Sequence, residues 1–255
     1  MKTITSKDNP TYKLAAKLTK RKYRDETGMY LIEGIKPLED AISAGMRIEQ
    51  IFVTERSREH GLPEENMILL NERLFEELSD TRCSQGVVAM VNQQESSNDM
   101  LLRLAEGNGG ILVLDRVQDP GNLGTMIRTA EAAGMAGVIL IKGCVDPYSP
   151  KVVRSAAGSL FRVPIIQKVD TDNLIEAAKA TGRRLAVTAL EGAVDYDRAG
   201  LGGRDMIVIG NEGRGVSDSF MKASDLKIKI PMAGSIESLN AAVAAGILMY
   251  ESQKI

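Results

Sequence analysis

The sequence contains no tryptophan, one histidine and two cysteines among its 255 residues. Cys83 and Cys144 are far apart and form no C-x-x-C pair, so their spacing supports neither a disulfide framework nor a zinc site. We expect both to be ordinary buried thiols. His60 lies in a polar, turn-like segment and not beside a nucleophile. Histidine-based acid–base catalysis and most metal chemistry are therefore excluded as first hypotheses.

Long hydrophobic runs are missing as well. No apolar run approaches the roughly eighteen residues that cross a membrane, and the N-terminal MKTITSKDNP has no hydrophobic signal region. We therefore expect a cytoplasmic protein without a membrane partner. Apolar residues still make up 44% of the chain, which is enough for a core in one large or two small domains.

The net charge of -2 suggests no partner, but basic residues gather near the N-terminus. Residues 1–30 hold eight lysines and arginines against three acidic residues, a local excess of 8 − 3 = +5. A solvated helix face is the ordinary explanation of such a run. The tight clustering, with Tyr12 and Tyr23 interleaved, favours nucleic-acid contact instead. The candidate contacts are Lys13, Lys17, Lys20, Arg21, Lys22 and Arg24, together with Arg154 from the second half of the chain.

Helix and strand patterns alternate through the first part of the chain. A basic helix is expected to begin at Asn9-Pro10. Strands are expected over 30–33, 48–54, 67–70 and 86–91, and helices over 36–44 and 72–78. This alternation predicts a compact α/β domain over residues 1–91. The polar segment 92–99 (NQQESSND) has no apolar period and is predicted to be a linker.

Residues 100–255 repeat the alternation and are predicted to form a second domain. Strands are expected over 111–117, 138–141, 163–169, 185–190, 206–209 and 226–230, and helices over 123–133, 151–160 and 172–180. This order is typical of a mostly parallel sheet, in which ligands bind at the carboxyl ends of the strands. The polar loops after Val117, Leu190, Ile209 and Ile230 are therefore candidate binding loops.

Two loops near the C-terminus combine polar residues with small ones. Strand 206–209 ends in GNEGRG, which holds Asn211 and Glu212. Glycines after a strand most often mark only a turn, and this late position does not match the dinucleotide-binding fingerprint. Strand 226–230 is stopped by Pro231, and an alanine-rich helix is expected soon after Ser235, with Asn240 in its first turns. Together the loops predict a pocket of backbone N–H groups, one carboxylate and two amides.

A third polar segment covers 119–130 (DPGNLGTMIRTA). Asn122 lies at the start of the predicted helix, and Arg128 follows six residues later. Arg128 can project from the polar face, because the opposite face is taken by Leu123, Met126, Ile127 and Ala130. A solvated surface arginine is the ordinary explanation, and Arg128 becomes a candidate only in combination with the other two segments.

The segments NLGTMIRTAEAAG, GNEGRGV and IPMAGSIESLNAAVA resemble, in this order, the three motifs of the SpoU/TrmH family of RNA ribose 2′-O-methyltransferases in the SPOUT superfamily. The resemblance covers roughly residues 107–255, and residues 1–91 are more weakly similar to an L30e-like RNA substrate-binding domain. It implies an α/β fold with an N-terminal L30e-like domain and a C-terminal SPOUT parallel-sheet domain carrying a deep trefoil knot, a rare exception to the rule against threading. It also implies S-adenosylmethionine as cofactor and a homodimer. The dimer is expected at the C-terminal helix, through Ala241, Ala242, Ala244, Ala245, Gly246, Leu248 and Met249.

The resemblance also implies individual site residues. Gly210, Ile230 and Leu239 would contact the cofactor largely through the main chain, with Met232 and Leu190 as apolar neighbours of the adenine. Small residues beside them would let the cofactor approach the backbone. The implied catalytic and substrate-positioning set is Asn122, Arg128, Glu212, Ser238 and Asn240. Ala242 stands where many relatives carry serine or threonine, so that position is given no role.

The implied chemistry agrees with the residues present. Methyl transfer from a sulfonium to a ribose hydroxyl is an in-line displacement that needs orientation and removal of a proton, but no metal. Because a guanidinium is effectively always protonated, Arg128 is interpreted as a contact to phosphate and developing alkoxide, and the proton acceptor stays open. The predicted function is 2′-O-methylation of a ribose in 23S-type large-subunit rRNA. The alternatives are a tRNA methyltransferase, a non-catalytic RNA-binding protein that kept the fold, and a nicotinamide-dependent oxidoreductase.

Overall fold

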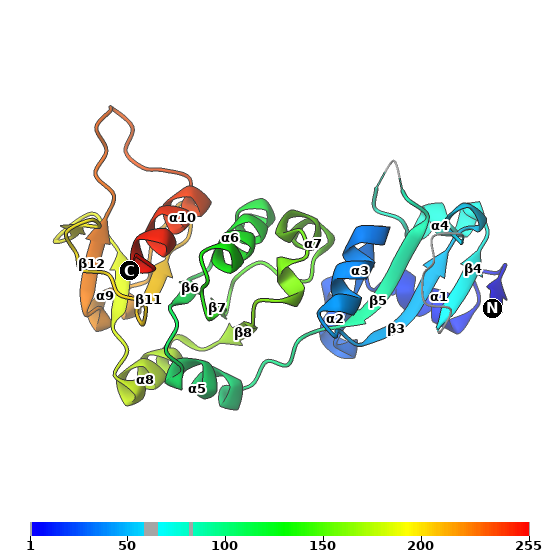
Figure 1. Ribbon diagram of the computed structural model, residues 1–255, viewed down its shortest axis with the longest axis horizontal. Helices are drawn as coiled ribbons and strands as arrows, with labels where there is room; N and C mark the ends of the chain where they lie inside the picture. The colour runs from blue at the N-terminus through cyan, green and yellow to red at the C-terminus, as the bar shows by residue number, and fades with distance from the viewer. Residues whose placement is uncertain (1, 59–65, 82–83, 255) are drawn as a thin grey trace. The chain divides into compact units, whose positions relative to one another are not determined.

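The computed structural model describes residues 2–58, 66–81 and 84–254 (Figure 1). His60 and Cys83 lie outside the described residues. The chain divides into two compact units: unit 1 contains Met1–Gln93 and Tyr148–Phe161, and unit 2 contains Gln94–Pro147 and Arg162–Ile255. The first boundary falls within the segment 92–99 that the sequence assigned to a linker. The grouping of Tyr148–Phe161 with unit 1 was not expected from sequence.

Unit 1 is built on a five-stranded mixed sheet in the order β1-β4-β3-β5-β2. Its strands are β1 (Lys2–Ile4), β2 (Met29–Glu33), β3 (Ile48–Val53), β4 (Met67–Leu70) and β5 (Val87–Asn92). β5 runs antiparallel to both β2 and β3, whereas β1, β3 and β4 are parallel. Its helices are α1 (Pro10–Lys17), α2 (Arg21–Thr27), α3 (Ile35–Ser43), α4 (Glu72–Leu78) and α7 (Pro150–Ala156), with short 3₁₀ turns η1 (Glu55–Ser57) and η2 (Ser159–Phe161).

The basic segment forms two helices where the sequence suggested one. Asn9 caps α1 by accepting the backbone N–H groups of Thr11 and Tyr12, and Pro10 occupies the first turn. α2 then ends at Gly28, whose φ of +65° is the left-handed conformation that glycine adopts without steric cost. One face of α1 packs into a core formed with β4, α4 and β5, which includes Tyr12, Ala15, Leu18, Leu70, Leu74, Phe75 and Val88.

Unit 2 is built on a seven-stranded sheet in the order β10-β12-β9-β11-β6-β7-β8, and every strand pair in it is parallel. Its strands are β6 (Ile111–Leu114), β7 (Gly137–Ile141), β8 (Ile165–Val169), β9 (Leu185–Thr188), β10 (Val194–Asp195), β11 (Met206–Ile209) and β12 (Leu226–Lys229). Its helices are α5 (Asn98–Glu106), α6 (Pro120–Ala132), α8 (Thr171–Thr181), α9 (Asp218–Ala223) and α10 (Ala241–Ser252). The predicted α/β class with a parallel sheet is confirmed.

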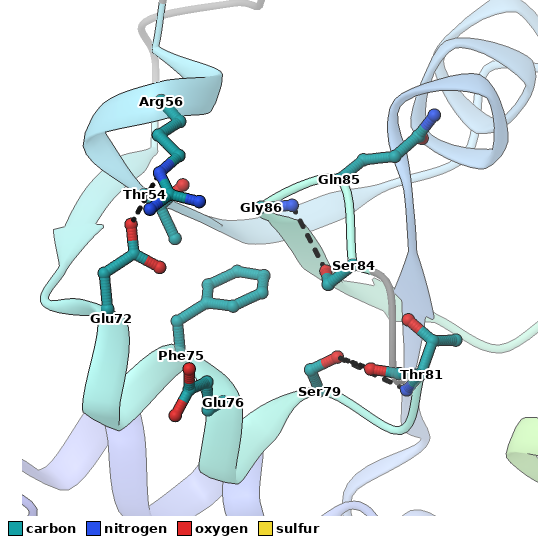
Figure 2. A pocket seen from close by; sticks show the side chains of 10 residues that line it. All are labelled: Thr54, Arg56, Glu72, Phe75, Glu76, Ser79, Thr81, Ser84, Gln85 and Gly86. Carbon is teal, nitrogen blue, oxygen red and sulfur yellow. Dashed lines mark hydrogen bonds and ion pairs between the residues drawn. The ribbon is translucent and has the colours of Figure 1, made fainter.

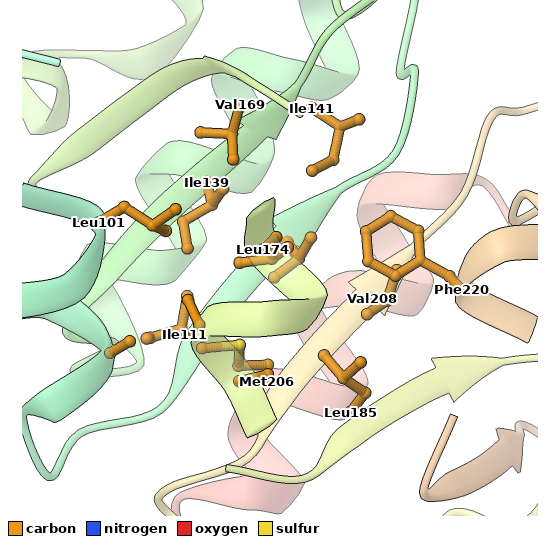
Figure 3. Close-up of a cluster of buried hydrophobic side chains, with 14 of the residues drawn as sticks. Leu101, Ile111, Ile139, Ile141, Val169, Leu174, Leu185, Met206, Val208 and Phe220 are labelled. Carbon is orange, nitrogen blue, oxygen red and sulfur yellow. The ribbon is translucent and has the colours of Figure 1, made fainter. Parts of the chain in front are cut away.

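Helices cover both faces of this sheet. α6 and α10 pack together on one face, while α5, α8 and α9 lie on the other (Figure 1). Between that second helix layer and the strands lies a core of buried side chains, which Figure 3 shows around Leu174, Val208 and Phe220. Burial on both faces explains why β6, β7 and β11 read as continuous apolar runs and not as alternating patterns.

Several element limits differ from the sequence prediction for local physical reasons. β6 stops at Leu114 and not at 117, because Arg116 has a φ of +60° that cannot continue a strand. α10 begins at Ala241, so Asn240 is its N-cap and not part of its first turn. α5 was missed because its polar start, capped by Ser97, looked like linker. β1, β10 and α9 are too short to give a periodic signal.

Arg183 joins the end of α5 to the sheet. It is 3% exposed, and its guanidinium donates hydrogen bonds to the carbonyl oxygens of Leu104, Ala105, Gly107, Gly109 and Arg204. The last carbonyls of a helix have no partner within the helix, so a forked donor placed here satisfies groups that would otherwise be buried and unpaired. No helix in the described part of the chain is long and apolar enough to cross a membrane.

We expect Arg183→Leu to lower the free energy of unfolding by about 3 kcal/mol, because the buried carbonyl of Ala105 and the part-buried carbonyls around it lose a shared donor. Urea denaturation measures the loss. Arg204→Leu is the matched control, since its exposed guanidinium makes one long hydrogen bond, to Thr181, and its removal should cost no more than about 0.5 kcal/mol. Equal losses in the two variants would contradict the assigned role.

Candidate functional site

The site lies where the direction of the strand order reverses. β7 and β8 extend the sheet on one side of β6. The later strands lie on the other side of β6, where β11 pairs with it directly. Leu114 and Ile209, the last residues of β6 and β11, are in register, and the N–H of Asp115 donates to the carbonyl of Ile209 at 2.8 Å. The loops that follow these two strands therefore begin side by side at the carboxyl edge of the sheet, where open α/β sheets bind ligands.

The loop after β11 closes on itself. The backbones of Asn211 and Gly215 exchange two hydrogen bonds, at 3.0 and 2.9 Å, and the side-chain oxygen of Asn211 accepts the N–H groups of Gly213 and Arg214. A Cβ added to Gly210 would lie 2.2 Å from the carbonyl carbon of Gly215. The loop's own backbone therefore requires glycine at this position. This reason differs from the sequence expectation that small residues leave room for a ligand.

Three predicted residues from three separate segments are joined by hydrogen bonds. One oxygen of the Glu212 carboxylate accepts the side-chain amide of Asn122 at 3.1 Å. The side-chain oxygen of Asn122 in turn accepts the amide of Asn240 at 2.9 Å. The side-chain oxygen of Asn240 caps α10 by accepting the N–H groups of Ala242 and Val243. This chain of Glu212, Asn122 and Asn240 is called the amide trio below.

Glu212 is held by four hydrogen-bond donors in all. Besides Asn122, its carboxylate accepts the backbone N–H groups of Gln118 and Asp119, both at 3.2 Å, and its own backbone N–H. Partial burial acts to raise its pKa, but the bonds from Glu212, Asn122, Gln118 and Asp119 outweigh this effect and hold the pKa below its ordinary value. Glu212 is therefore an ionised anchor for the loop 118–122, and its lone pairs are already engaged.

Arg128 and Ser238 do not join the amide trio. Arg128 is exposed on α6, as its helical position predicted, and makes no hydrogen bond or ion pair within the described residues. Ser238 is exposed in the segment between β12 and α10 and likewise has no hydrogen bond to the trio in the described structure. Both side chains are left available to a substrate.

The predicted cofactor residues follow three neighbouring strands. Leu190 comes after β9, Gly210 after β11, and Ile230 after β12, and these strands are adjacent in the sheet. Met232 and Leu239 lie in the segment that leads from β12 to α10. Leu190 is 79% exposed and Ile236 is 59% exposed.

Unit 1 contains a pocket that the sequence analysis missed. The pocket has a volume of about 600 Å³, and Figure 2 shows the ring of Phe75 pointing into it from α4. The other lining residues are Thr54, Arg56, Glu72, Glu76, Ser79, Thr81, Ser84, Gln85 and Gly86. Nε of Arg56 lies 3.6 Å from a carboxylate oxygen of Glu72, so these two charges balance. Glu76 then leaves the lining with an excess of negative charge. Such a lining disfavours an anionic ligand. Four separate segments supply these walls, so no sequence motif marks the pocket.

The predicted nucleic-acid contacts in unit 1 fall into two groups. Lys13, Lys17, Lys20, Arg21 and Lys22 are exposed. Lys17 and Lys22 place their ammonium groups 5.3 and 5.9 Å from the ring centre of Tyr23. Arg24, by contrast, is 4% exposed and donates to the carbonyl of Leu18 at 2.7 Å, and Tyr12 is 4% exposed with its hydroxyl bonded to Leu74. Arg24 and Tyr12 are therefore structural in this unit. Arg154 is paired with Asp80.

Comparison with known proteins identifies the class of protein to which this fold and site belong. Residues 110–250 match the SpoU rRNA Methylase family, and residues 9–89 match the MRM3-like substrate binding domain. The chain is 35% identical to the 23S rRNA (guanosine(2553)-2′-O)-methyltransferase RlmP of Bacillus subtilis, over 98% of each chain. An AdoMet-bound rRNA methyltransferase from Sinorhizobium meliloti has a TM-score of 0.89 at 33% identity, covering 99% of this chain and 97% of that one.

A second solved structure is that of the SpoU methyltransferase AviRb from Streptomyces viridochromogenes in complex with AdoMet. It has a TM-score of 0.82 at 28% identity, and the match covers 96% of this chain and 97% of that one. The protein is thus an S-adenosylmethionine-dependent RNA methyltransferase. The chain belongs to the SpoU rRNA methylase family.

The electrostatics of Glu212 generate a prediction about stability. Because its pKa in the folded protein lies below the ordinary value of 4.5, ionised Glu212 stabilises the fold above that pH, and the contribution is lost as the pH falls through the folded-state pKa. Glu212→Gln should therefore be less stable than the wild type near neutral pH, and the difference should narrow below pH 4.5. Denaturant unfolding of both proteins across this range measures it. The exposed Glu191→Gln is the control, and a difference independent of pH would contradict the prediction.

Proposed function

We propose that the protein transfers a methyl group from S-adenosylmethionine to the 2′-hydroxyl of a ribose in 23S-type large-subunit ribosomal RNA. The observation that carries the proposal is the amide trio, which joins the three motif segments of an rRNA methylase family member at the carboxyl edge of a parallel sheet. The name of the Bacillus subtilis relative, which methylates a 2′-oxygen of 23S rRNA and matches nearly the whole chain, supports this choice of substrate.

S-adenosylmethionine supplies an electrophilic methyl group when bound. Gly210, Ile230 and Leu239 would hold it through their backbones, with Met232 and Leu190 against its adenine. Glu212 and Asn122 fix the distance between the loops that face the ribose, and Asn240 fixes the start of α10. Such rigidity matters because in-line transfer depends on the alignment of the reacting atoms.

Arg128 and Ser238 are the polar side chains that remain available for the RNA. We assign Arg128 to a phosphate contact and to stabilisation of the developing alkoxide, since its exposed guanidinium carries a permanent charge. We assign Ser238, whose side chain is exposed, to orientation of the ribose. Glu212 is a positioning carboxylate and not a base, because four donors already occupy it.

Residues 1–91 are proposed to be the RNA substrate-binding domain, followed by a linker over 92–99 and the methyltransferase domain over 100–255. The match to the MRM3-like substrate binding domain over residues 9–89 supports this role. The proposed contacts are Lys13, Lys17, Lys20, Arg21 and Lys22, because these side chains are exposed on α1, on α2 and between them. The stack of Lys17, Tyr23 and Lys22 offers positive charge beside an aromatic face. Arg24 is left out because it is buried. Arg154 stays a candidate although it is ion-paired, since Lys13 and Arg21 are ion-paired as well.

We further propose a homodimer through α10. Leu248 and Met249, which the sequence placed at the dimer interface, are fully buried within the protomer, as is Ala245. The outward face of the helix instead shows Val243, 52% exposed, and Tyr250, 54% exposed, with Ile247 half-buried between them. An apolar stripe of this kind on one helix supports a two-fold contact.

We also propose that the chain carries the trefoil knot of the family, and the packing of α10 on α6 and β11 is consistent with it. A cytoplasmic location follows from the proposed substrate.

The first test is direct. Purified protein, labelled S-adenosylmethionine and rRNA or tRNA are incubated, and the modified ribose is mapped by its resistance to alkaline cleavage. Methylation of 23S-type rRNA alone is expected. Methyl transfer to tRNA alone would show that the substrate is tRNA and not rRNA. Saturable cofactor binding with no transfer to any RNA would favour a non-catalytic protein.

The same assay tests Arg128. We expect Arg128→Ala to lower the single-turnover rate by about 100-fold, the usual scale for loss of one preorganised charge-stabilising donor, with unchanged affinity for S-adenosylmethionine. Arg128→Lys should recover part of the rate, because a point charge cannot reproduce a planar fork. If sites are shared across the dimer, a mixture of Arg128→Ala and Asn240→Ala proteins should regain activity. Activity equal to the sum of the two variants, with subunit exchange verified, would place Arg128 outside the partner's site.

The RNA contacts of unit 1 are tested by salt dependence. Lys17→Ala combined with Lys20→Ala should weaken RNA binding and reduce the slope of log affinity against log salt by about 1 to 2, because about one counterion is released per neutralised phosphate. Affinity for S-adenosylmethionine should not change. Lys179→Ala, an exposed lysine on α8 of unit 2, is the control. An unchanged slope in the double variant would remove these lysines from the interface.

A further inference from the structure

Asp115 and Arg116, which follow β6, form an ion pair in which the Asp115 side chain is buried and the Arg116 side chain is 37% exposed. Asp115 follows the last residue of β6 and is 1% exposed. Arg116 donates from Nε to one oxygen of this carboxylate at 3.0 Å and from Nη2 to the other at 3.4 Å. Neither residue belongs to the predicted catalytic residues or to the predicted cofactor-binding residues.

The pair holds both ends of the loop after β11. The carboxylate of Asp115 accepts the N–H of Ser217 at 2.7 Å, where that loop ends. The carbonyl of Arg116 accepts the side-chain amide of Asn211 at 2.9 Å, where the loop begins. Glu212 lies between these two points and binds Gln118, Asp119 and Asn122. Glu212 therefore lies in a loop whose two ends are both bonded to residues 115–116.

Arg116 adopts a backbone conformation that an arginine rarely takes. Its φ is +60°, in the left-handed region where a side chain other than that of glycine is strained. This conformation turns the carbonyl of Arg116 toward Asn211 while the guanidinium stays on Asp115. A glycine would relieve the strain but would lose the ion pair. The presence of arginine in this conformation indicates that its ion pair with Asp115 contributes to the structure or the function of the site.

We propose that Asp115 and Arg116 are positioning residues that orient the loop Asn211–Ser217, and Glu212 with it, for methyl transfer. The inference rests on the proposed function, because its principal readout is the rate of that reaction. Neither side chain contacts the substrate in this scheme. The pair acts by holding Ser217 and Asn211 so that Glu212 meets Asn122 at hydrogen-bonding distance.

The decisive variant is Arg116→Gly, which removes the ion pair and relieves the strained φ at the same time. The protein should stay folded, because relief of the strained φ offsets part of the cost of leaving the Asp115 carboxylate without its cation. Its single-turnover methylation rate should fall by about tenfold or more, because displacement of Glu212 misaligns the loops that it holds, while the Kd for RNA changes by less than about twofold. Asp115→Asn should likewise lower the methylation rate and leave the Kd for RNA nearly unchanged. Arg116→Lys, which keeps a cation beside Asp115, should recover most of the rate.

Two control variants separate positioning from general stability. Asp205 forms a similar pair with Arg184, at 2.9 and 2.7 Å, and accepts the N–H of Gly202, but it precedes β11 and so lies at the opposite edge of the sheet. Asp205→Asn should lower the melting temperature and leave the methylation rate within about twofold of the wild type. Lys168→Gly relieves a comparable φ of +58° within β8 and should not slow the reaction.

Hydrogen exchange provides a readout that does not depend on catalysis. The amides of Asn211–Ser217 should exchange faster in Arg116→Gly than in the wild type, and those of β11 should not change. If wild-type protein transfers no methyl group to RNA, the proposed function fails, and this exchange measurement alone decides the positioning role. A wild-type rate in Arg116→Gly, an equal loss of rate in Asp205→Asn, or unchanged exchange in the loop would each overturn the inference.

Discussion

The parallel pairing of β11 with β6 is the contact on which the site depends. It brings the residues after Leu114 beside those after Ile209, although 95 positions separate the two strand ends in the sequence. A chain that passes from β6 outward to β8, and only later returns to the other side of β6, leaves an opening at this reversal because the two loops diverge from it. The amide trio is assembled there from the first turn of α6, the loop after β11 and the N-cap of α10.

The start of the loop after β11 is restrained because the polar groups of Asn211 are satisfied within the loop or by the neighbouring loop. Asn211 uses its backbone on Gly215, its side-chain oxygen on Gly213 and Arg214, and its amide on Arg116. Such a loop loses little further entropy when a ligand binds, so its groups can be preorganised for a transition state. This arrangement suits a transfer that depends on alignment. Preorganisation also explains how a chain with one histidine can support catalysis.

Local sequence signals predicted most of the elements but not the contacts between distant segments. The limits of α4, β4 and β11 were predicted to the residue, because clear caps, glycines or apolar runs mark them. Glu212, Asn122 and Asn240 were named from motif resemblance, yet nothing in the spacing shows that they form one hydrogen-bonded chain.

Burial was the main source of error in the choice of individual residues. Arg24 and Tyr12 looked like surface groups because their neighbours in sequence are charged, but the helical period turns both inward. The start of α10 was misplaced for a related reason, since the polar and apolar residues before Asn240 mimic a helical turn although the backbone there is irregular and bent. Such cases depend on what a segment packs against, which a single sequence does not record.

Asn240 shows how closely the site and the fold depend on each other. The oxygen of its side chain satisfies two free N–H groups at the start of α10, while its nitrogen donates to Asn122. An aspartate could cap the helix equally well but would present a second acceptor to the oxygen of Asn122, and a serine could cap it but would not reach as far. Only an amide meets both requirements. The orientation of α10, fixed by burial of Ala245, Leu248 and Met249, therefore also fixes one member of the trio.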